Sequence, residues 1–261
     1  MKFIGSLIAL SGIAATGCMD GLSHLDISVG EGQLATGPIT TDTRTPGEFN
    51  KISVGGAMKV NLTVGESGPL KIDAPSDIMK DIKTEVKDGR LSITLEGHHE
   101  LKKQIVVTAY AKSLDEINGS GATTWTVKGI NAGDFSLIGS GASTFNVEGT
   151  VKSLKLHLNG ASQVKTLKME GGDLTAELTG ASTAKLTGSV GSMDIEESGA
   201  SNLHLDGSGR TLHMVISGAS SIEAGVREKV TGQAHGASSA RISGNPTVEV
   251  ESTGVSSVHT G

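Results

Sequence analysis

Apolar and polar positions alternate along two stretches of every repeat in the C-terminal half of the chain. Four residues after each of eight regularly spaced glycines stands an apolar residue, the next position is polar, and the one after it is mostly apolar. A second alternating stretch precedes each glycine, with apolar residues six and four positions before it. This period-two alternation predicts β-strands with one buried face. The apolar column four residues after the glycines comprises Trp125, Phe145, Val164, Ala184, Leu203, Ile222, Ala240 and Val258.

The glycines belong to a recurring Gly-Ala-Ser/Thr motif with a spacing of 18 to 20 residues. One such unit cannot bury its own apolar face, whereas stacked units can, so we predict an all-β β-solenoid over residues 121–261. We expect the small residue after each glycine to be closely packed in a tight corner, and the following hydroxyl to bond local backbone. The motif glycines are Gly121, Gly141, Gly160, Gly180, Gly199, Gly218, Gly236 and Gly254, the last in the variant Gly254-Val255-Ser256.

Residues 47–120 alternate in the same way but without the fixed period. We interpret them as an irregular β portion that caps the N-terminal end of the solenoid. Strands are predicted over residues 49–54, 58–64, 70–74, 90–96 and 105–110, and one short helical turn followed by a strand is predicted between 75 and 87.

The first residues have the architecture of a bacterial signal peptide. A basic residue, Lys2, precedes an apolar run over residues 3–14, and small residues then lead to Cys18, the single cysteine. The run is too short for a permanent transmembrane helix. Residues 15–18 resemble a bacterial lipobox, which implies a signal peptide over 1–17 and lipidation of Cys18; the alternative is an ordinary signal peptide. Residues 18–46 are expected to form a lipidated, flexible tether.

Composition narrows the function further. The chain contains 37 glycines and 2% aromatic residues, and its formal charge of −6 is spread along the chain. No basic patch suited to nucleic acid is evident. A lone cysteine excludes an intrachain disulfide. Met19, rather than Asp, follows Cys18, which under lipoprotein sorting implies the outer membrane; the periplasmic and surface faces both remain open.

The sequence contains few side chains in arrangements typical of catalysis or metal binding, and we predict no catalytic residue, no metal and no cofactor. His98 and His99, beside Glu96 and Glu100, are interpreted as a solvated loop rather than a metal site. A paired-carboxylate glycosidase site is not favoured, because its candidate residues occupy exposed positions of the alternation. With Trp125 expected inside and Tyr110 alone outside, sugar stacking is not expected either. The carboxylates in question are Glu177, Asp194 and Glu196.

One outward column is mainly basic and is our candidate binding surface. Its residues would lie about 5 Å apart on neighbouring coils. It would suit an anionic polysaccharide or a lipid headgroup, although an exposed sheet face kept soluble by charge gives the same pattern. The stripe consists of Lys165, Lys185, His204 and Arg241, with Glu223 and His259 in the same column.

Three features together resemble the DUF2807 family, the head GIN domain of adhesins. They are the segment Phe49-Asn50-Lys51-Ile52-Ser53-Val54-Gly55-Gly56, the segment Gly89-Arg90-Leu91-Ser92-Ile93, and the serial glycine turns, followed by Gly244-Asn245-Pro246 near the end. The likeness covers about residues 47 to 261, although the turns here are mostly Gly-Ala-Ser rather than Gly-Ser-Gly. It implies a β-helix-like fold and says little about activity, since fold alone does not fix function.

These observations predict a cell-envelope interaction or adhesion module without catalysis. The alternative is a β-helix enzyme or binding protein that acts on envelope polysaccharide. The expected partners are the membrane, through the lipid anchor, and an envelope polysaccharide or protein. A second copy could also pair with the edge of the C-terminal coil, where the last strands lack a cap.

Overall fold

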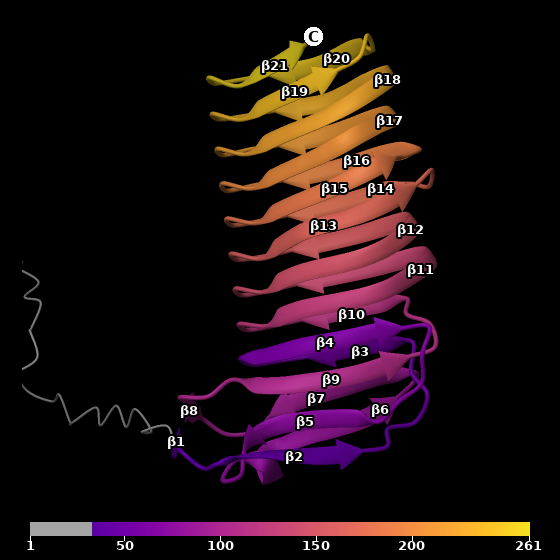
Figure 1. The fold of residues 1–261 in the computed structure, drawn as a ribbon. Helices are drawn as coiled ribbons and strands as arrows, with labels where there is room; N and C mark the ends of the chain where they lie inside the picture. The colour runs from indigo at the N-terminus through magenta and orange to yellow at the C-terminus, as the bar shows by residue number, and fades with distance from the viewer. Residues whose placement is uncertain (1–32) are drawn as a thin grey trace, which may run out of the picture. The chain divides into compact units, whose positions relative to one another are not determined.

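The computed structural model describes residues 33–261, which form a β-solenoid of stacked coils with one short 3₁₀ turn and no α-helix (Figure 1). About eight turns of roughly 19 residues repeat along it, and 67% of the described residues lie in strands. Our prediction of an all-β solenoid is therefore confirmed. The signal peptide, Cys18 and the first part of the tether lie outside the described residues.

Each coil contributes one strand segment to each of two faces, joined at one side by the Gly-Ala-Ser corner. Neighbouring coils pair in parallel, so the apolar columns stack in register, for example Trp125 on Phe145 and Phe145 on Val164. The columns predicted to be inside are buried throughout, except in the last coil, where Val248 is 38% exposed. The repeat strands are β11 (Thr124–Gly139), β12 (Thr144–Leu158), β13 (Gln163–Glu170), β14 (Leu174–Leu178), β15 (Thr183–Ser189), β16 (Ser192–Glu197), β17 (Asn202–Ile216), β18 (Ser221–Ala234), β19 (Ser239–Ser243), β20 (Thr247–Ser252) and β21 (Ser257–Thr260).

Glycine is required at each corner because of how closely the coils approach. Gly180 has φ +77°, a conformation that side-chain-bearing residues rarely adopt, and a Cβ there would lie 2.6 Å from the carbonyl oxygen of Gly160. The next amide, that of Ala181, donates a hydrogen bond of 2.7 Å to the same carbonyl. The repeated motif thus places a column of glycine carbonyls and amides in direct contact from coil to coil.

Our expectation for the alanine after each glycine was wrong. Ala181 and its equivalents are exposed at the tip of the turn, whereas the next residue, Ser182, is fully buried. The left-handed glycine directs the following side chain outward, and the serine is the residue that returns to the core. Its hydroxyl donates a 2.8 Å hydrogen bond to the carbonyl of Thr179, which confirms the expected bond to local backbone.

Small and large residues oppose each other inside the corner. Trp125 and Phe145 stack with ring centroids 5.9 Å apart, and the Trp125 indole N–H donates to Thr123 Oγ1 at 2.9 Å. The column two residues before the motif is glycine in these coils: a Cβ at Gly119 would lie 2.6 Å from Trp125 Nε1, and one at Gly139 2.7 Å from the Phe145 ring. In the next two coils the inward column holds the smaller Val164 and Ala184, and the opposing position holds Leu158 and Leu178.

The strands predicted in the N-terminal portion are present, and they form both the first coils and a cap. The segment of β3 and β4 lies between the β7–β9 segment and the first repeat strands, and it pairs in parallel with both. Gly56 occupies the corner below Gly121, because the amide of Ala122 donates to the Gly56 carbonyl at 2.9 Å. The strands are β3 (Lys51–Val54), β4 (Met58–Val64), β5 (Leu70–Pro75), β6 (Ile82–Lys87), β7 (Arg90–Leu95), β9 (Ile105–Ala111) and β10 (Glu116–Gly119), and the 3₁₀ turn is η1 (Met79–Asp81).

Residues 33–46, which we expected to be part of a flexible tether, contain two strands. Strand β2 (Ile39–Arg44) pairs antiparallel with β5, and β1 (Gln33–Ala35) pairs parallel with β8 (His99–Leu101). The β2 side chains are exposed or half-buried on both faces, so this edge strand carries no hydrophobic alternation that sequence could reveal. The polar composition that suggested a tether in this segment is therefore that of an edge strand of the cap.

The cap closes the N-terminal end of the stack with antiparallel strands. Strand β5 pairs antiparallel with β9 on one face, and β6 pairs antiparallel with β7 on the other. Arg44 connects the two capping edges, since its Nη1 donates to the carbonyl of Ile82 at 2.9 Å and to Thr84 Oγ1 at 3.0 Å. Among residues 33–261, none lies in a helix long and apolar enough to span a membrane.

Candidate functional site

The basic stripe is an outward column on one face of the repeat strands. Strand pairing places Lys185 beside His204, His204 beside Glu223, and Glu223 beside Arg241. Adjacent members are therefore one strand apart, about 4.8 Å. All of these side chains are exposed or half-buried, as the alternation predicted.

Lys165 does not continue this column in register. The ladder pairs Phe145 with Val164 and then Asn146 with Thr166, so Lys165 is an inserted residue at a β-bulge. The bulge also explains why Thr166 breaks the apolar pattern, because Leu167 takes the buried position instead. Lys165 thus stands on the same face as the stripe, beside its ladder.

Glu223 divides the charge of the stripe. Its Oε2 lies 3.0 Å from His204 Nδ1, with the histidine side chain 39% and the glutamate side chain 58% exposed. The Arg241 side chain forms no hydrogen bond or ion pair with another residue of 33–261. The positive charge of Arg241 is therefore not neutralised by a carboxylate within the described residues.

The upper part of the stripe lines a shallow groove of about 430 Å³. Its lining includes His204, Asp206, Glu223, Arg241 and His259. A register shift creates the hollow: β17 pairs Leu205 with Ala224 and then Ser208 with Gly225, which leaves two residues of β17 without partners in the next coil. Both carboxylates of the groove are exposed to solvent.

The histidine pair near residue 98 is arranged differently from a metal site. His98 and Glu100 are exposed, whereas the His99 side chain is only 5% exposed, so it is not the solvated residue that we expected. Its Nε2 hydrogen bonds the carbonyl of Glu96 at 2.8 Å and lies 3.5 Å from Asp81 Oδ2. No cluster of three or more His, Cys, Asp or Glu side chains suited to a metal occurs among residues 33–261.

One buried acid was missed by the sequence analysis. Glu177, Asp194 and Glu196 are exposed as expected, but Glu197 is buried, with an exposed fraction of 3%. It points into the core two positions before the corner glycine, paired in register with Leu178 below and Ile216 above. Extending the inward alternation from Met193 and Ile195 by one more step would have identified this position.

Neither carboxylate oxygen of Glu197 has a hydrogen-bond partner. Burial raises the pKa of Glu197 to about 8, and the nearby Ser221 amide offsets this only in part. That amide donates its hydrogen bond to the carbonyl of Ser201 at 2.9 Å. Glu197 is therefore protonated near neutral pH and belongs to the core, away from the stripe and from solvent.

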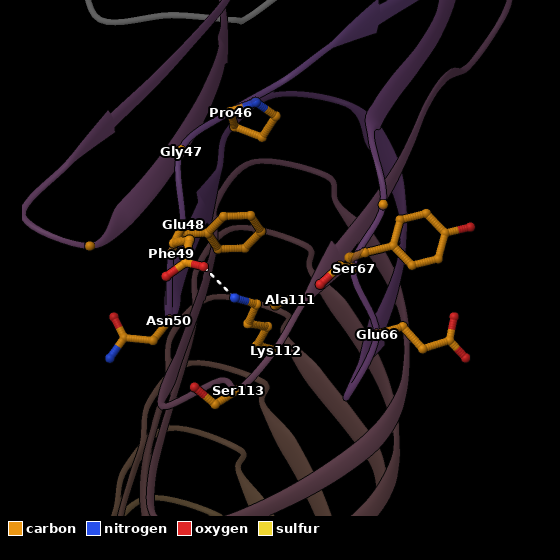
Figure 2. Close-up of a pocket in the computed structure, with 13 residues that line it drawn as sticks. Pro46, Gly47, Glu48, Phe49, Asn50, Glu66, Ser67, Ala111, Lys112 and Ser113 are labelled. Atoms are coloured by element: carbon orange, nitrogen blue, oxygen red, sulfur yellow. Dashed lines mark hydrogen bonds and ion pairs between the residues drawn. The ribbon is translucent and has the colours of Figure 1, made fainter.

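A second hollow, which we call the cap pocket, has a volume of about 530 Å³ and lies between the cap and the first coils. Four parts of the chain line it: residues 46–50 before β3, residues 66–68 after β4, Gly89 between β6 and β7, and residues 110–113 at the end of β9. Figure 2 shows Glu48 and Lys112 joined as an ion pair beside the Phe49 ring. The Lys112 ammonium, by hydrogen bonding and by charge, lowers the pKa of Glu48.

Stacked parallel coils, polar outer faces and a strand-built cap define the class of protein as a β-solenoid. Within that class, the chain belongs to the DUF2807 family, described as "putative auto-transporter adhesin, head GIN domain", whose model matches residues 48–246. The resemblance inferred from the sequence is therefore confirmed. A search among curated proteins found no significant match.

Several solved structures share the fold. A "putative adhesin" from Parabacteroides merdae ATCC 43184 is 17% identical, with a TM-score of 0.74 over 87% of this chain and 98% of that one. A "putative adhesin" from Bacteroides fragilis NCTC 9343 is 20% identical, with a TM-score of 0.63 over 88% and 100%. A "putative lipid binding protein" from Parabacteroides distasonis ATCC 8503 is 15% identical, with a TM-score of 0.73 over 88% and 100%. At these identities the likeness establishes the fold.

Proposed function

We propose that the chain is a lipid-anchored interaction module of the bacterial cell envelope that adheres to an anionic polysaccharide through its basic stripe. The observation that carries this proposal is the ladder of Lys185, His204 and Arg241 on one rigid face, with Arg241 unpaired among residues 33–261. Lys185 and His204 are adjacent, and Arg241 follows one strand beyond Glu223. Cations held at fixed positions on a rigid face suit a polymer that carries several acidic groups.

The anchor in this proposal is Cys18, and the expected site is the outer membrane. Acyl chains on one cysteine hold a protein stably when two or three are present, since a single chain binds membranes only marginally. Fourteen residues lie between Cys18 and Gln33 of β1, and the chain from one to the other can span up to about 50 Å when fully extended. The module would thus reach ligands well beyond the lipid headgroups.

Two kinds of observation support a binding role over catalysis. The groove carboxylates Asp206 and Glu223 are exposed, and charges open to water stabilise a transition state much less than charges held in a dry, preorganised site. Two structural neighbours carry the description "putative adhesin", which agrees with adhesion as the role of this fold. The competing function is a β-helix enzyme that cleaves polysaccharide in the groove.

A glycan array tests the proposal directly. Purified full chain carrying Cys18→Ser, which prevents lipidation, is applied to arrayed acidic and neutral glycans, and the glycans are analysed afterwards for cleavage. We expect binding to acidic polysaccharides, competition by salt and no change in glycan length. Absence of binding to every acidic glycan would contradict the proposal, and shortened glycans would favour the enzyme.

A further inference from the structure

The aromatic side chains divide sharply between the core and the cap pocket. Trp125, Phe135 and Phe145 are at most 2% exposed. The two remaining aromatics of residues 33–261, Phe49 and Tyr110, are half-buried, and both line the cap pocket. In a chain with 2% aromatic residues, this places every solvent-accessible ring of the described part at one site.

The chain holds Tyr110 in place from one side. Tyr110 lies on the outer face of β9, whose alternate residues are buried. The turn after β4 packs against the ring, since a Cβ at Gly68 would lie only 2.5 Å from a Tyr110 ring carbon. The same turn is fixed to β9 because the amide of Gly65 donates to the carbonyl of Ala111 at 2.9 Å. Glycine at 68 is therefore what permits this flat contact.

Polar side chains on the opposite segments are also fixed. Asn50 is held by two hydrogen bonds. Its backbone amide donates to the Gly89 carbonyl at 3.0 Å, and its side-chain Nδ2 donates to Asp115 Oδ2 at 2.6 Å. Lys112 is held by Glu48, as Figure 2 shows, and the side chains of Ser67 and Ser113 complete the polar rim. The pocket thus combines oriented rings with hydrogen-bonding groups that are already positioned.

We propose that the cap pocket binds an uncharged pyranose ring of a saccharide. A pyranose has an apolar C–H face that can lie on an aromatic ring and a rim of hydroxyl groups that need donors and acceptors. Tyr110 and Phe49 supply the aromatic surface for the C–H face. Asn50, Ser67 and Lys112 supply hydrogen-bonding groups for the hydroxyls. A pocket with an apolar wall and a few convergent polar groups is the usual form of a small-ligand site.

Charge and desolvation select this ligand over two others. The lining holds two acids, Glu48 and Glu66, against one cation, Lys112, which is already paired with Glu48, so the lining does not favour an anionic ligand. An acyl chain would cover the Glu48–Lys112 pair without replacing its hydrogen bonds to water, which costs free energy. Sugar hydroxyls can replace those bonds. This site is separate from the basic stripe, and its occupancy does not depend on the stripe's function.

The test is a titration of the ¹⁵N-labelled full chain carrying Cys18→Ser with defined oligosaccharides, followed by amide chemical shifts. The probes are hexasaccharides of glucose, mannose, galactose and N-acetylglucosamine, with oligogalacturonate and laurate as anionic and acyl controls. At least one neutral hexasaccharide is expected to shift the amides of residues 47–50, 66–68 and 110–113. Neither control is expected to shift them.

Variants then tie binding to the pocket. Tyr110→Ala removes the ring and Gly68→Ala displaces it, so each variant should weaken binding at least tenfold. Tyr110→Phe keeps the ring and should weaken binding less than threefold. Lys112→Ala changes a side chain that is 70% exposed, so it tests the rim without endangering the fold, and it should weaken binding at least threefold. Thr108→Ala, on the outer face of the same strand, is the matched control and should have no effect.

The proposal is overturned if no neutral hexasaccharide shifts the pocket amides, or if Gly68→Ala and Lys112→Ala both bind like the parent chain. Stronger shifts with laurate would assign the pocket to an acyl chain instead, and stronger shifts with oligogalacturonate would contradict the charge argument. None of these results bears on the stripe, because stripe binding is read from acidic glycans and from variants of Lys185 and Arg241.

Discussion

At the corner of each coil, three consecutive residues have three distinct roles. The glycine allows close approach of the coils, the alanine occupies the exposed tip, and the serine returns to the core and bonds the backbone. In the fourth Gly-Ala-Ser/Thr motif these residues are Gly180, Ala181 and Ser182. The division agrees with glycine at the first position of all eight motifs and with the larger Val255, which is 80% exposed, at the second position of the last one.

Substitutions at one corner should separate these roles. Gly180→Ala places a Cβ 2.6 Å from the Gly160 carbonyl oxygen at φ +77°, and we expect it to lower the free energy of unfolding by about 1–3 kcal/mol. Ala181→Leu, at the exposed tip, should change it by less than about 0.5 kcal/mol. Thermal unfolding of both variants checks this. Equal effects, or a larger loss for Ala181→Leu, would contradict the assigned roles.

The buried acid Glu197 should make stability depend on pH. Burial raises its pKa from 4.5 to about 8, so the folded state keeps a proton that the unfolded state loses. This contribution is fully present below pH 4.5 and is lost as pH rises to about 8. Across that window the wild type should lose about 2–4 kcal/mol relative to Glu197→Leu.

Glu197→Leu should also be more stable at pH 5, by about 1–3 kcal/mol, because it removes an unsatisfied carboxyl between Leu178 and Ile216. The control is Glu196→Gln at the exposed neighbouring position, which should follow the wild type. Chemical denaturation at several pH values measures all three proteins. Parallel curves for wild type and Glu197→Leu would show that Glu197 is not the group responsible.

At the scale of elements, the cap depends on a contact between its two edges. Arg44 of β2 donates to the Ile82 carbonyl and to Thr84 Oγ1 of β6, which joins the two faces at the N-terminal end. Removing it should open the cap locally rather than unfold the coils, because the repeat strands keep their own pairing.

We therefore expect Arg44→Ala to speed amide exchange in β2 and β6 about tenfold, equivalent to about 1.4 kcal/mol, and to leave β14–β17 unchanged. Arg227→Ala serves as a control, since Arg227 is exposed and reaches Ser208 only at 3.5 Å. Hydrogen exchange with mass spectrometry resolves these segments. Unchanged exchange in β6 would mean that other contacts close the cap.

Elements with hydrophobic alternation were predictable, and those without it were not. The predicted β4 over 58–64 matches the structure, because its buried face leaves a period-two signal. The helical turn and strand predicted between 75 and 87 are also present, as η1 and β6. Strand β2 leaves none, since it is an edge. The corner at Gly56 was missed because the cap strands separate it from Gly121 and interrupt the period.

The candidate sites were predictable to different extents. An outward column follows directly from alternation, so the members of the stripe on β15, β17 and β19 could be named in advance, but the bulge at Lys165 depends on pairing with the neighbouring coil. The cap pocket brings together Phe49 and Tyr110, which are 61 positions apart in the sequence. The chain between them has no repeat from which this proximity could be predicted. Only the three-dimensional arrangement brings these residues together.

At the scale of the whole molecule, the proposed membrane attachment rests on one residue, Cys18. Cys18→Ser removes the thiol that would carry the lipid, so cleavage before residue 18 should be lost, and any chain that is cut at another site should move from the membrane fraction to the soluble fraction. Fractionation followed by mass spectrometry of the N-terminus measures both. Normal maturation and continued membrane retention of the variant would contradict lipid anchoring.

The central claim, that the basic stripe of the solenoid binds an anionic polymer, is tested most directly by affinity for an acidic polysaccharide with and without the stripe charges. Purified chain carrying Cys18→Ser is compared with the same chain carrying Lys185→Gln and Arg241→Gln, both at exposed positions that should not alter folding. Interferometry on immobilised acidic polysaccharide should show at least tenfold weaker binding for the stripe variant and a decline with salt for the parent chain. Equal affinity of the two proteins at low salt, where the stripe charges are least screened, would contradict the account.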